Sequence, residues 1–388
     1  MNYDFDKIID RRDTDCYKYD QAETVFGVPG LLPMWVADMD FQSPPEVIAA
    51  VRTCCERGVF GYTYRSEEAE HAFMAWVDKH HSWKIRQEWM LSSPGVVTAL
   101  SIGVQVYSKQ GERVMIMTPV YQRFFSVVTE NERELVCSSL VIENNRYVID
   151  WEDFEAKLKS NVKLLIVSNP HNPVGRQWTR EELIKMGTLC LTHGVTILSD
   201  EIHADLALFG HKHTVMASIS EEIAHITVTM MAPSKTFNIA GMMNSVVVIS
   251  SPVLRERFEQ EVAVTHINGG NIFGHVTFKA AYQQGAPWRD ALLRYLENNI
   301  RYTDDYIRRE LPGVSLFFPE CSFLLWIDFR RTGLSHQEIG ERLLYKAKVG
   351  LNNGTDFGPE GEGFYRMNIG CPLSVVKEGL GRIKSILE

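Results

Sequence analysis

Five short runs of apolar, largely β-branched residues constrain the fold more than any other feature of this sequence. They are RVMIMT (113–118), KLLIVS (163–168), VTILSD (195–200), HITVTM (225–230) and SVVVIS (245–250). Runs of this length that are apolar almost throughout are typical of strands covered on both faces, as in a parallel sheet. Helical stretches separate several of them, such as 178–193, where Thr179 and Glu182 have the spacing of a helix start. The alternation predicts an α/β architecture with a mostly parallel sheet.

The C-terminal part of the chain has a different pattern. It reads as a long helix (288–310), a strand within SFLLWIDF (322–329), a helix (335–347) and a final helix (373–387). We expect a second, smaller α+β unit, completed by the N-terminal arm. The predicted division is a large unit at 46–287 and a small unit formed by 1–45 together with 288–388.

Charge and composition exclude several classes of function. The net charge is −9 and no basic stripe offsets it, which argues against a nucleic-acid-binding surface. No run of 18 apolar residues occurs, so we expect no membrane span, and the charged start lacks the apolar core of a secretory signal. The seven cysteines are odd in number and form no CxxC pair. Reduced thiols in the cytoplasm are the natural expectation.

Polar and aromatic side chains follow four consecutive candidate strands. These are Tyr121, Asn172, Asp200 and Lys235. Parallel sheets bind ligands at the carboxyl ends of their strands, so we expect an aromatic ring, an amide, a carboxylate and an amine at one edge. The segment SSPGVVTAL (92–100) reads as a turn that opens into a helix, whose free N–H groups could hold a phosphate.

This set of groups suits pyridoxal phosphate better than other cofactors. That cofactor needs a lysine for a Schiff base, a carboxylate against its pyridine nitrogen, a phosphate anchor and a stacking aromatic. Lys235 lies between apolar segments, and low polarity favours the neutral, nucleophilic amine. Taken singly, Lys235 is more simply a surface lysine, Asp200 a helix cap and Tyr121 a core aromatic. Their coincidence at successive strand ends favours the cofactor.

Several motifs carry a resemblance to a known family. They are LPMWVADMDF, GYTYRSEE, SNPHNPVGR, SDEIHADL, APSKTFNIAG and FGPEGEGFYRMNIGCP, with the region around Trp288. Together they resemble the MalY/PatB-type cystathionine β-lyase/C–S lyase branch of the fold-type I, class I/II aminotransferase-like enzymes, over nearly the whole chain. The resemblance implies a mostly parallel seven-stranded sheet sandwiched by helices and dependence on pyridoxal phosphate. It also implies β-elimination of cysteine S-conjugates such as L-cystathionine, giving a thiol (homocysteine), pyruvate and ammonia.

The resemblance also implies roles for the residues around the cofactor ring. Lys235 is expected to carry the cofactor and then move the Cα proton. Asp200 is expected to pair with the pyridinium nitrogen, and Asn172 to bind the ring 3′-oxygen. Tyr121 is expected to stack on the ring and take part in catalysis, and with Asn172 to help bind the substrate. His203 is expected close behind the ring or packed beside it.

Further implied roles concern the phosphate and the substrate. Val96, Val97 and Ser234 are expected to hold the phosphate through backbone and hydroxyl donors. Tyr62 is expected to reach that phosphate from a neighbouring subunit, which implies a homodimer with a shared active site. Arg366 matches the arginine that grips the α-carboxylate of the amino-acid substrate through a bidentate pair.

Two other activities stay open at this stage. An aminotransferase on the same fold would keep the amine on the cofactor and need a keto acid as second substrate. Binding of a transcription regulator, beside or instead of catalysis, is associated with some members of the resembled branch. A metal site is not expected, because His203 and the HKH run at 211–213 fit no zinc-binding spacing.

Three residues depart from the pattern of the resembled branch. Cys321 and Ser322 stand where a glycine and a threonine are expected, and Arg123 stands where a proline is typical. An extra cation near the pocket favours a substrate with an acidic distal group, such as the second carboxylate of cystathionine.

Overall fold

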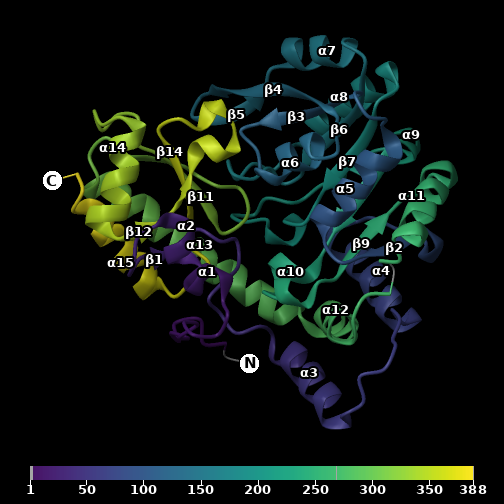
Figure 1. The fold of residues 1–388 in the computed structure, drawn as a ribbon, viewed down its shortest axis with the longest axis horizontal. Coiled ribbons are helices and arrows are strands. Elements are labelled where there is room, and N and C mark those ends of the chain that lie inside the picture. The colour runs from purple at the N-terminus through teal and green to yellow at the C-terminus, as the bar shows by residue number, and fades with distance from the viewer. Residues whose placement is uncertain (1–2, 268, 388) are drawn as a thin grey trace.

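An eight-stranded mixed sheet forms the centre of the larger lobe in this computed structural model, which describes residues 3–267 and 269–387 (Figure 1). The strand order is β2-β9-β8-β7-β6-β3-β4-β5. Strands β8, β7, β6, β3 and β4 run parallel, while β9 is antiparallel to both of its neighbours and β5 is antiparallel to β4. The predicted architecture with a mostly parallel sheet is therefore confirmed.

The bounds of the strands are β1 Leu32–Pro33, β2 Met90–Ser93, β3 Arg113–Thr118, β4 Glu134–Glu143, β5 Arg146–Ile149, β6 Val162–Ser168, β7 Thr196–Asp200, β8 Thr227–Met231, β9 Ser245–Val248, β10 Ser315–Phe317, β11 Leu324–Asp328, β12 Val349–Gly350, β13 Asn352–Asn353 and β14 Phe364–Asn368. The α-helices are α1 Tyr17–Asp20, α2 Ala22–Phe26, α3 Pro45–Arg57, α4 Glu67–His81, α5 Val96–Tyr107, α6 Arg123–Thr129, α7 Trp151–Lys159, α8 Arg180–His193, α9 Glu221–His225, α10 Pro233–Thr236, α11 Pro252–Thr265, α12 Ile272–Gln284, α13 Ala286–Glu310, α14 His336–Glu341 and α15 Leu373–Lys384. Short 3-10 turns are η1 Gln87–Trp89, η2 Ala204–Leu206, η3 Met216–Ser218, η4 Ala240–Met242, η6 Gly354–Phe357 and η7 Pro359–Gly361, and η5 Arg342–Ala347 is a π-helical segment.

All five predicted strands are present, as β3, β6, β7, β8 and β9. The sheet has eight strands among the described residues where seven were expected, and β5 pairs with the preceding β4 as its outermost strand. These two strands were missed because β4 is partly exposed and Ser138 and Ser139 interrupt its apolar residues. Asn144 and Asn145 both have positive φ between them, as the tight turn of a hairpin requires.

Helices cover both faces of the sheet, which explains why its strands are apolar almost throughout. Val114 and Ile116 of β3 pack into the cluster formed with α5, α6 and α11. Met115 and Met117 point the other way, into the cluster formed with α7 and α8. Successive side chains on a strand point to opposite faces, so burying both faces requires apolar residues at each position. The predicted capping box at the start of α8, Thr179 with Glu182, is confirmed.

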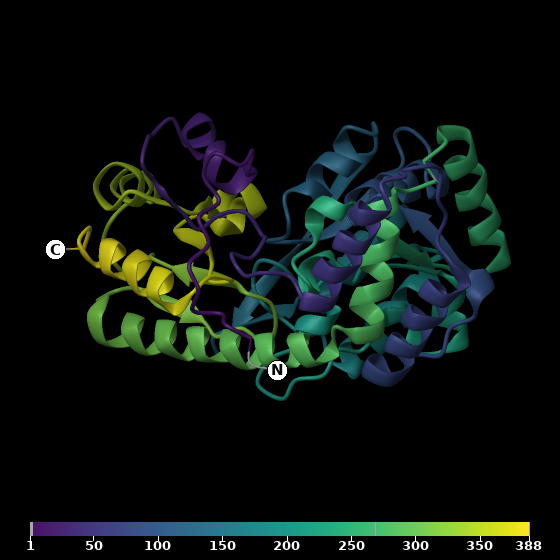
Figure 2. The same cartoon turned by 90° about the horizontal axis from the view of Figure 1, so that it is seen from below.

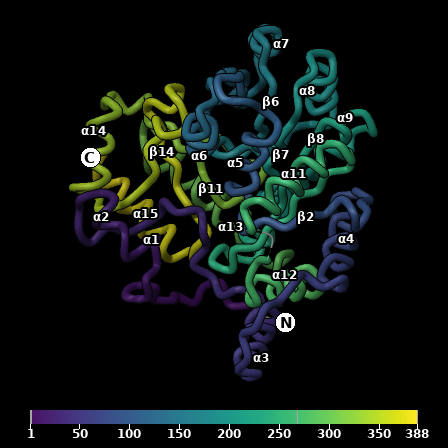
Figure 3. Tube along the Cα trace, turned by 45° about the vertical axis from the view of Figure 1, so that its right-hand side comes forward, coloured from purple at the N-terminus to yellow at the C-terminus, as the bar shows by residue number. Residues whose placement is uncertain are grey.

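The smaller lobe is built on a four-stranded antiparallel sheet of order β10-β11-β14-β13. The 25-residue helix α13 runs along this lobe and on toward the larger one (Figure 2). The N-terminal α1 and α2 lie beside the C-terminal α15 (Figure 3), and β1 pairs with β12. The predicted helices 288–310 and 373–387 are found as α13 and α15, with ends that differ by a few residues at most, and the predicted helix 335–347 is divided between α14 and η5.

The proposed boundaries at 45/46 and 287/288 stay a prediction. One apolar cluster contains residues from both sides of them, such as Phe73, Trp288 and Leu325. Residues 1, 2 and 388 of the predicted small unit and residue 268 of the large one lie outside the described residues. Across 3–267 and 269–387, no helix is long and apolar enough to cross a membrane.

Candidate active site

A cavity of about 200 Å3 opens at the carboxyl ends of the central strands. The predicted residues that line it are Val96, Val97, Tyr121, Asn172, Asp200, His203, Ser234 and Lys235. Strands β3, β6, β7 and β8 are direct neighbours in the sheet, so the residues that follow them reach the same edge. Two of these residues are joined directly by the backbone hydrogen bond from the Tyr121 N–H to the Asn172 carbonyl, at 3.1 Å.

Lys235 lies in α10, a single helical turn that follows β8. Its Nζ donates a hydrogen bond of 2.6 Å to the carbonyl of Ala37. Burial lowers the pKa of the Lys235 amine to about 8, and the charge of Arg366 acts in the same direction, against Asp38 and Asp200. At neutral to slightly basic pH, a useful fraction of this amine is therefore unprotonated and nucleophilic.

Asp200 is the last residue of β7 and is buried. Burial raises the pKa of its carboxyl group to about 7, while the hydrogen bond from the Ile202 N–H (3.1 Å) and the charge of Lys235 act against that rise. A buried carboxylate with so little compensation favours the approach of a cationic group. It therefore suits a protonated ring nitrogen.

Arg366 lies in β14 of the smaller sheet and is buried. Its guanidinium donates to Asn172 Oδ1 at 3.1 Å, to Asn352 Oδ1 at 2.7 Å and to the Trp35 carbonyl at 3.2 Å. Burial lowers the pKa of Arg366 to about 10, so it stays charged at neutral pH. The buried Nε atom has no hydrogen-bond partner among the described residues. The cation thus keeps an unused donor, as an anion-binding arginine should, and Arg366 contacts the cavity residue Asn172 without lining the cavity itself.

The start of helix α5 forms the opposite end of the cavity. Gly95 is its N-cap and makes no side-chain cap, so the first N–H groups of Val96, Val97 and Thr98 are free of that cap. Free N–H groups and the helix dipole together favour an anion such as phosphate. Ser234, at the start of α10, adds a hydroxyl to the same cavity.

His203 and the unusual Ser322 contact each other. Ser322 Oγ lies 3.2 Å from His203 Nδ1, and burial lowers the pKa of His203 to about 3, which leaves this ring neutral. Ser322 has a φ of 72°, a left-handed conformation that glycine adopts more readily. Cys321 is buried, and burial raises the pKa of its thiol well above the ordinary value. Both departures from the family pattern therefore lie behind His203.

The segment after β1 contributes site atoms that sequence reasoning missed. Ala37 receives the Lys235 hydrogen bond, and Asp38 acts on the Lys235 pKa. This segment is fixed by Asn238, whose side chain accepts from the Met39 N–H at 3.0 Å and donates to two carbonyls of the segment. A backbone carbonyl such as that of Ala37 leaves no signal in a sequence, because every residue has one.

Tyr62 is the one predicted site residue whose side chain is fully exposed. Its neighbours Val59, Phe60 and Tyr64 are exposed as well. Tyr62 does not line the cavity of its own chain. Its assignment to the active site of a neighbouring subunit stays a prediction.

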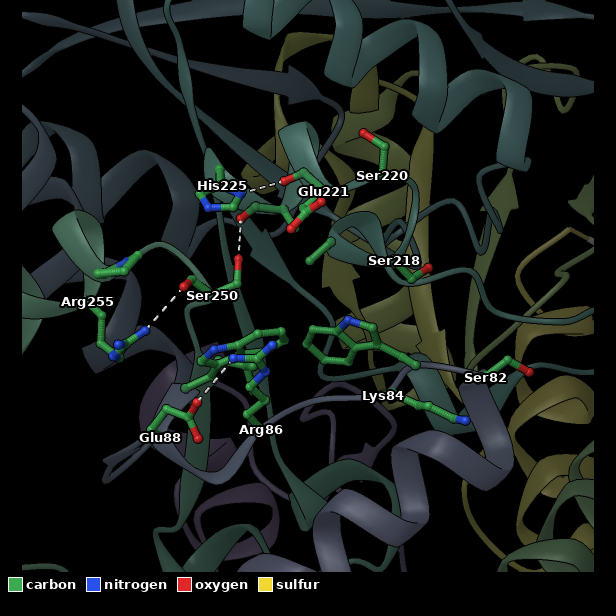
Figure 4. Close-up of a pocket in the computed structure, with 16 residues that line it drawn as sticks. Ser82, Lys84, Arg86, Glu88, Ser218, Ser220, Glu221, His225, Ser250 and Arg255 are labelled. Atoms are coloured by element: carbon green, nitrogen blue, oxygen red, sulfur yellow. Dashed lines mark hydrogen bonds and ion pairs between the residues drawn. The ribbon is translucent and has the colours of Figure 1, made fainter.

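A larger cavity, of about 700 Å3, is lined by the segment 82–89 that follows α4, by η3 and α9, by the end of β9 and by the start of α11 (Figure 4). Several of its charged side chains already have partners within the chain. Arg86 lies 3.7 Å from Glu88, Arg255 donates to the Ser250 carbonyl at 3.2 Å, and His225 contacts the Glu221 carbonyl (Figure 4). None of the predicted site residues lines it. The smaller cavity is the better candidate for the active site, because burial of its Asp200 and Lys235 side chains is little offset by partners within the chain.

The fold and this cavity define a class of protein, and comparison with known proteins agrees. The family model for aminotransferase class I and II matches residues 32–383, and the chain belongs to that family. It is 45% identical to the cystathionine beta-lyase PatB of Bacillus subtilis and 32% identical to the protein MalY of Escherichia coli, in each case over 99% of both chains. Cystalysin from Treponema denticola, solved with pyridoxal 5′-phosphate, superposes with a TM-score of 0.96 at 35% identity, over 100% of this chain and 99% of that one.

Proposed function

We propose that this chain is a pyridoxal-phosphate-dependent carbon–sulfur lyase that cleaves cysteine S-conjugates such as L-cystathionine. One observation carries the proposal. The Lys235 amine, with its lowered pKa, and the buried Asp200 carboxylate line one cavity, in a chain 45% identical along its length to a cystathionine beta-lyase. The overall reaction consumes water, breaks the Cβ–S bond, and yields a thiol, pyruvate and ammonia.

The groups in the cavity fit the cofactor. Asp200 is short of a cationic partner, the start of α5 is an uncapped helix N-terminus, and Lys235 is the amine between them. Lys235, Asp200, Asn172 and Tyr121 would hold the ring, while Ser234 and the first N–H groups of α5 would hold the phosphate. When bound, pyridoxal phosphate supplies an aldehyde that takes up the substrate amine and a ring that accepts electrons from Cα.

The residues of the chain then supply binding and proton transfer. Arg366 binds the α-carboxylate of the substrate, using the guanidinium donor that the protein leaves free. This orients the substrate so that the freed Lys235 amine takes the proton from Cα. An amine with a pKa of about 8 is well matched to accept and return a proton near neutral pH. Tyr121 covers the same cavity and restricts water at Cα.

We also propose that the enzyme is a homodimer in the cytoplasm, with each active site completed by Tyr62 of the other subunit. The exposed Tyr62, with exposed Val59, Phe60 and Tyr64 around it, supports an interface at this segment. Seven free cysteines support a reducing compartment. In a mixture of Lys235→Ala and Tyr62→Ala chains, one active site of each mixed dimer is intact. Recovery of activity on mixing two inactive variants supports the shared site, and no recovery contradicts it.

The direct test of the function uses the purified protein with pyridoxal phosphate and L-cystathionine, without any added keto acid. Release of pyruvate and homocysteine in equal amounts is expected. An aminotransferase would instead release no pyruvate and would need a keto acid for continued turnover. Absence of pyruvate, with turnover only after a keto acid is added, would overturn the lyase assignment in favour of that alternative.

A further inference from the structure

A second cluster of buried polar side chains lies directly behind the lysine. It consists of Asp205, Trp76, His81 and Thr236, and we call it the anchor cluster. Asp205 lies in η2, shortly after Asp200, while Trp76 and His81 belong to α4. Thr236 is the residue next to Lys235 and the last residue of α10. The cluster therefore joins three separate elements around one carboxylate.

The hydrogen bonds of Asp205 use both of its carboxylate oxygens. Oδ1 accepts from Trp76 Nε1 at 2.8 Å and lies 2.8 Å from His81 Nε2. Oδ2 accepts from Thr236 Oγ1 at 3.0 Å. Bonds to an ionised acceptor are stronger than those between neutral groups, so this carboxylate is a firm attachment point.

Charges around the cluster keep Asp205 ionised. Burial alone would raise its pKa, but the hydrogen bond and charge of His81, the charge of Arg289 and the hydrogen bond from Trp76 hold it well below the ordinary value. The Arg289 guanidinium lies 4.9 Å above the Trp76 ring. The His213 ring meets the His81 ring edge-on at 5.4 Å. Asp205 is thus a fully compensated buried anion, and none of its partners points into the cavity of Lys235.

The element that carries Lys235 needs such an attachment. Helix α10 has four residues and its N-cap, Ala232, makes no side-chain cap. Forming a single helical turn costs more conformational entropy than its few hydrogen bonds offset, so such a turn is not stable by itself. The Thr236 hydroxyl is buried. Its hydrogen bond to Asp205 is the only side-chain hydrogen bond among the described residues that joins α10 to the rest of the anchor cluster.

We propose that Asp205 is a positioning residue that acts through Thr236, holding the α10 turn so that the Lys235 amine stays in its low-polarity place facing the substrate. Asp205 itself touches neither the cavity nor the reacting atoms. This inference rests on the proposed function for its kinetic consequence. The position and ionisation of the lysine are properties of the chain alone and are measurable without turnover.

Three variants test this arrangement. Thr236→Val removes the hydroxyl and keeps the shape, while Thr236→Ser restores a hydroxyl on the same atom. Thr229→Val is the matched control, because the Thr229 hydroxyl is also buried, in the neighbouring β8, but has no hydrogen-bond partner among the described residues. Asp205→Asn changes the other partner of the Thr236–Asp205 hydrogen bond, and thermal melting checks that this variant folds.

The primary measurement is the rate at which the cofactor-free protein takes up added pyridoxal phosphate, followed by absorbance as a function of pH. For Thr236→Val we expect the lysine pKa in this profile to move up by about one pH unit, because a looser turn admits water to the amine. The uptake rate at pH 7 is then expected to fall about 10-fold. Thr236→Ser and Thr229→Val are expected to match the unmodified protein.

The second measurement is turnover of L-cystathionine. Thr236→Val is expected to lower kcat by about 10- to 100-fold and leave KM within about 2-fold, since positioning acts on the reacting lysine and not on substrate binding. A Thr236→Val protein with a lower melting temperature but an unchanged uptake profile and kcat would overturn the proposal and leave a purely structural bond. Failure of Thr236→Ser to restore the profile would overturn it as well. If no variant, nor the unmodified protein, turns over cystathionine, the proposed function fails, while the uptake profile still decides this inference.

Discussion

Asp200 is the last residue of β7 and Asp205 lies in η2 shortly after it, and although both are buried, their pKa values are shifted in opposite directions. The pKa of Asp200 is raised to about 7 because burial is barely compensated. The pKa of Asp205 lies well below its ordinary value, because donors and positive charges more than offset its burial. The burial of Asp200 is little offset within the chain, whereas hydrogen bonds and positive charges already offset the burial of Asp205.

The difference separates binding groups from supporting groups. The residues around the cavity, Lys235, Asp200 and Arg366, each keep a charge or a donor that the protein leaves unsatisfied. Leaving such groups unsatisfied lowers the stability of the cofactor-free protein, and a ligand recovers that free energy on binding. The charge of Asp205 in the anchor cluster is offset within the protein, and the cluster does not line the cavity. Buried charge by itself therefore does not mark a functional site, whereas buried charge without a partner does.

The largest effect is expected from Lys235→Ala, which removes the reacting amine. Lyase activity should fall by at least about 10^4-fold, together with loss of the cofactor's protein-bound absorbance. The free energy of unfolding of the cofactor-free protein should not fall, because a desolvated amine is removed. Lys212→Ala, an exposed lysine, serves as the control and should keep full activity. Substantial lyase activity in the Lys235→Ala protein would show that Lys235 is not the reacting amine.

The two aspartates themselves provide the next test, in the cofactor-free protein. Above the ordinary Asp value of 3.8, the raised pKa of Asp200 means that the folded state binds more protons than the unfolded state, so stability is lost as pH rises from about 4 to about 7. Asp200→Asn should remove that loss and raise the free energy of unfolding at pH 8, by up to about 4 kcal/mol.

Asp205→Asn should change the free energy of unfolding in the opposite direction. A depressed pKa contributes stability above the unfolded value of 3.8 that is lost only as pH falls through the folded value. The variant should therefore lose about 3 kcal/mol at both pH 5 and pH 8. Urea unfolding followed by tryptophan fluorescence at the two pH values measures both effects. If both variants are destabilised alike, the distinction between the two carboxylates is wrong.

Arg366→Lys sharpens the comparison on the substrate side. A lysine keeps the charge but loses the planar pair of donors, so KM for L-cystathionine should rise about 10- to 100-fold with a smaller change in kcat. Arg330→Lys is a matched control, because Arg330 makes a two-pronged pair with Asp328 in the same lobe, away from the cavity. An unchanged KM in Arg366→Lys would remove Arg366 from the substrate site.

The sequence predicted the five central strands and a minority of the helices, among them α8, α13 and α15, because their apolar periodicity follows directly from burial on one or both faces. It also predicted the cavity residues at strand ends, since parallel neighbours must bring those ends to one edge. The β4–β5 hairpin was missed because Ser138 and Ser139 interrupt the apolar residues of β4, and several of its residues are exposed. Its edge position leaves one side of the ladder in solvent, so no continuous apolar run marks it.

The anchor cluster was not predictable for a different reason. Trp76 and His81 lie 129 and 124 residues before Asp205 in the chain, and neither belongs to a motif of the sequence, although Asp205 itself lies in SDEIHADL. The Ala37 carbonyl that receives the Lys235 hydrogen bond is a backbone atom without any residue preference. Contacts of this kind depend on how distant elements pack, and that packing is decided by the whole core. The residues that line the cavity could be predicted from the sequence, whereas the anchor cluster behind Lys235 could not.

The smallest effect is expected from Arg123, the residue that departs from the family pattern at the start of α6. Arg123 is exposed, and while burial raises the pKa of Tyr121, which lines the cavity, the Arg123 guanidinium acts against that larger effect. A guanidinium in that place favours a substrate whose distal group carries a negative charge. Because solvent screens an exposed charge, the contribution is at most about 1 kcal/mol, or about 5-fold in kcat/KM.

Arg123→Gln should therefore lower kcat/KM for L-cystathionine by about 2- to 5-fold and leave S-methylcysteine unchanged. Arg308→Gln, an exposed arginine on α13, controls for the change in net charge. The ratio between the two substrates should also fall in the unmodified protein as salt is raised from 50 mM to 500 mM, on the order of the same few-fold, since screening acts on the same charge. Equal losses on both substrates would show that Arg123 acts through Tyr121 on catalysis itself. It would then belong with the supporting groups, like Asp205, and not with the groups that wait for a ligand.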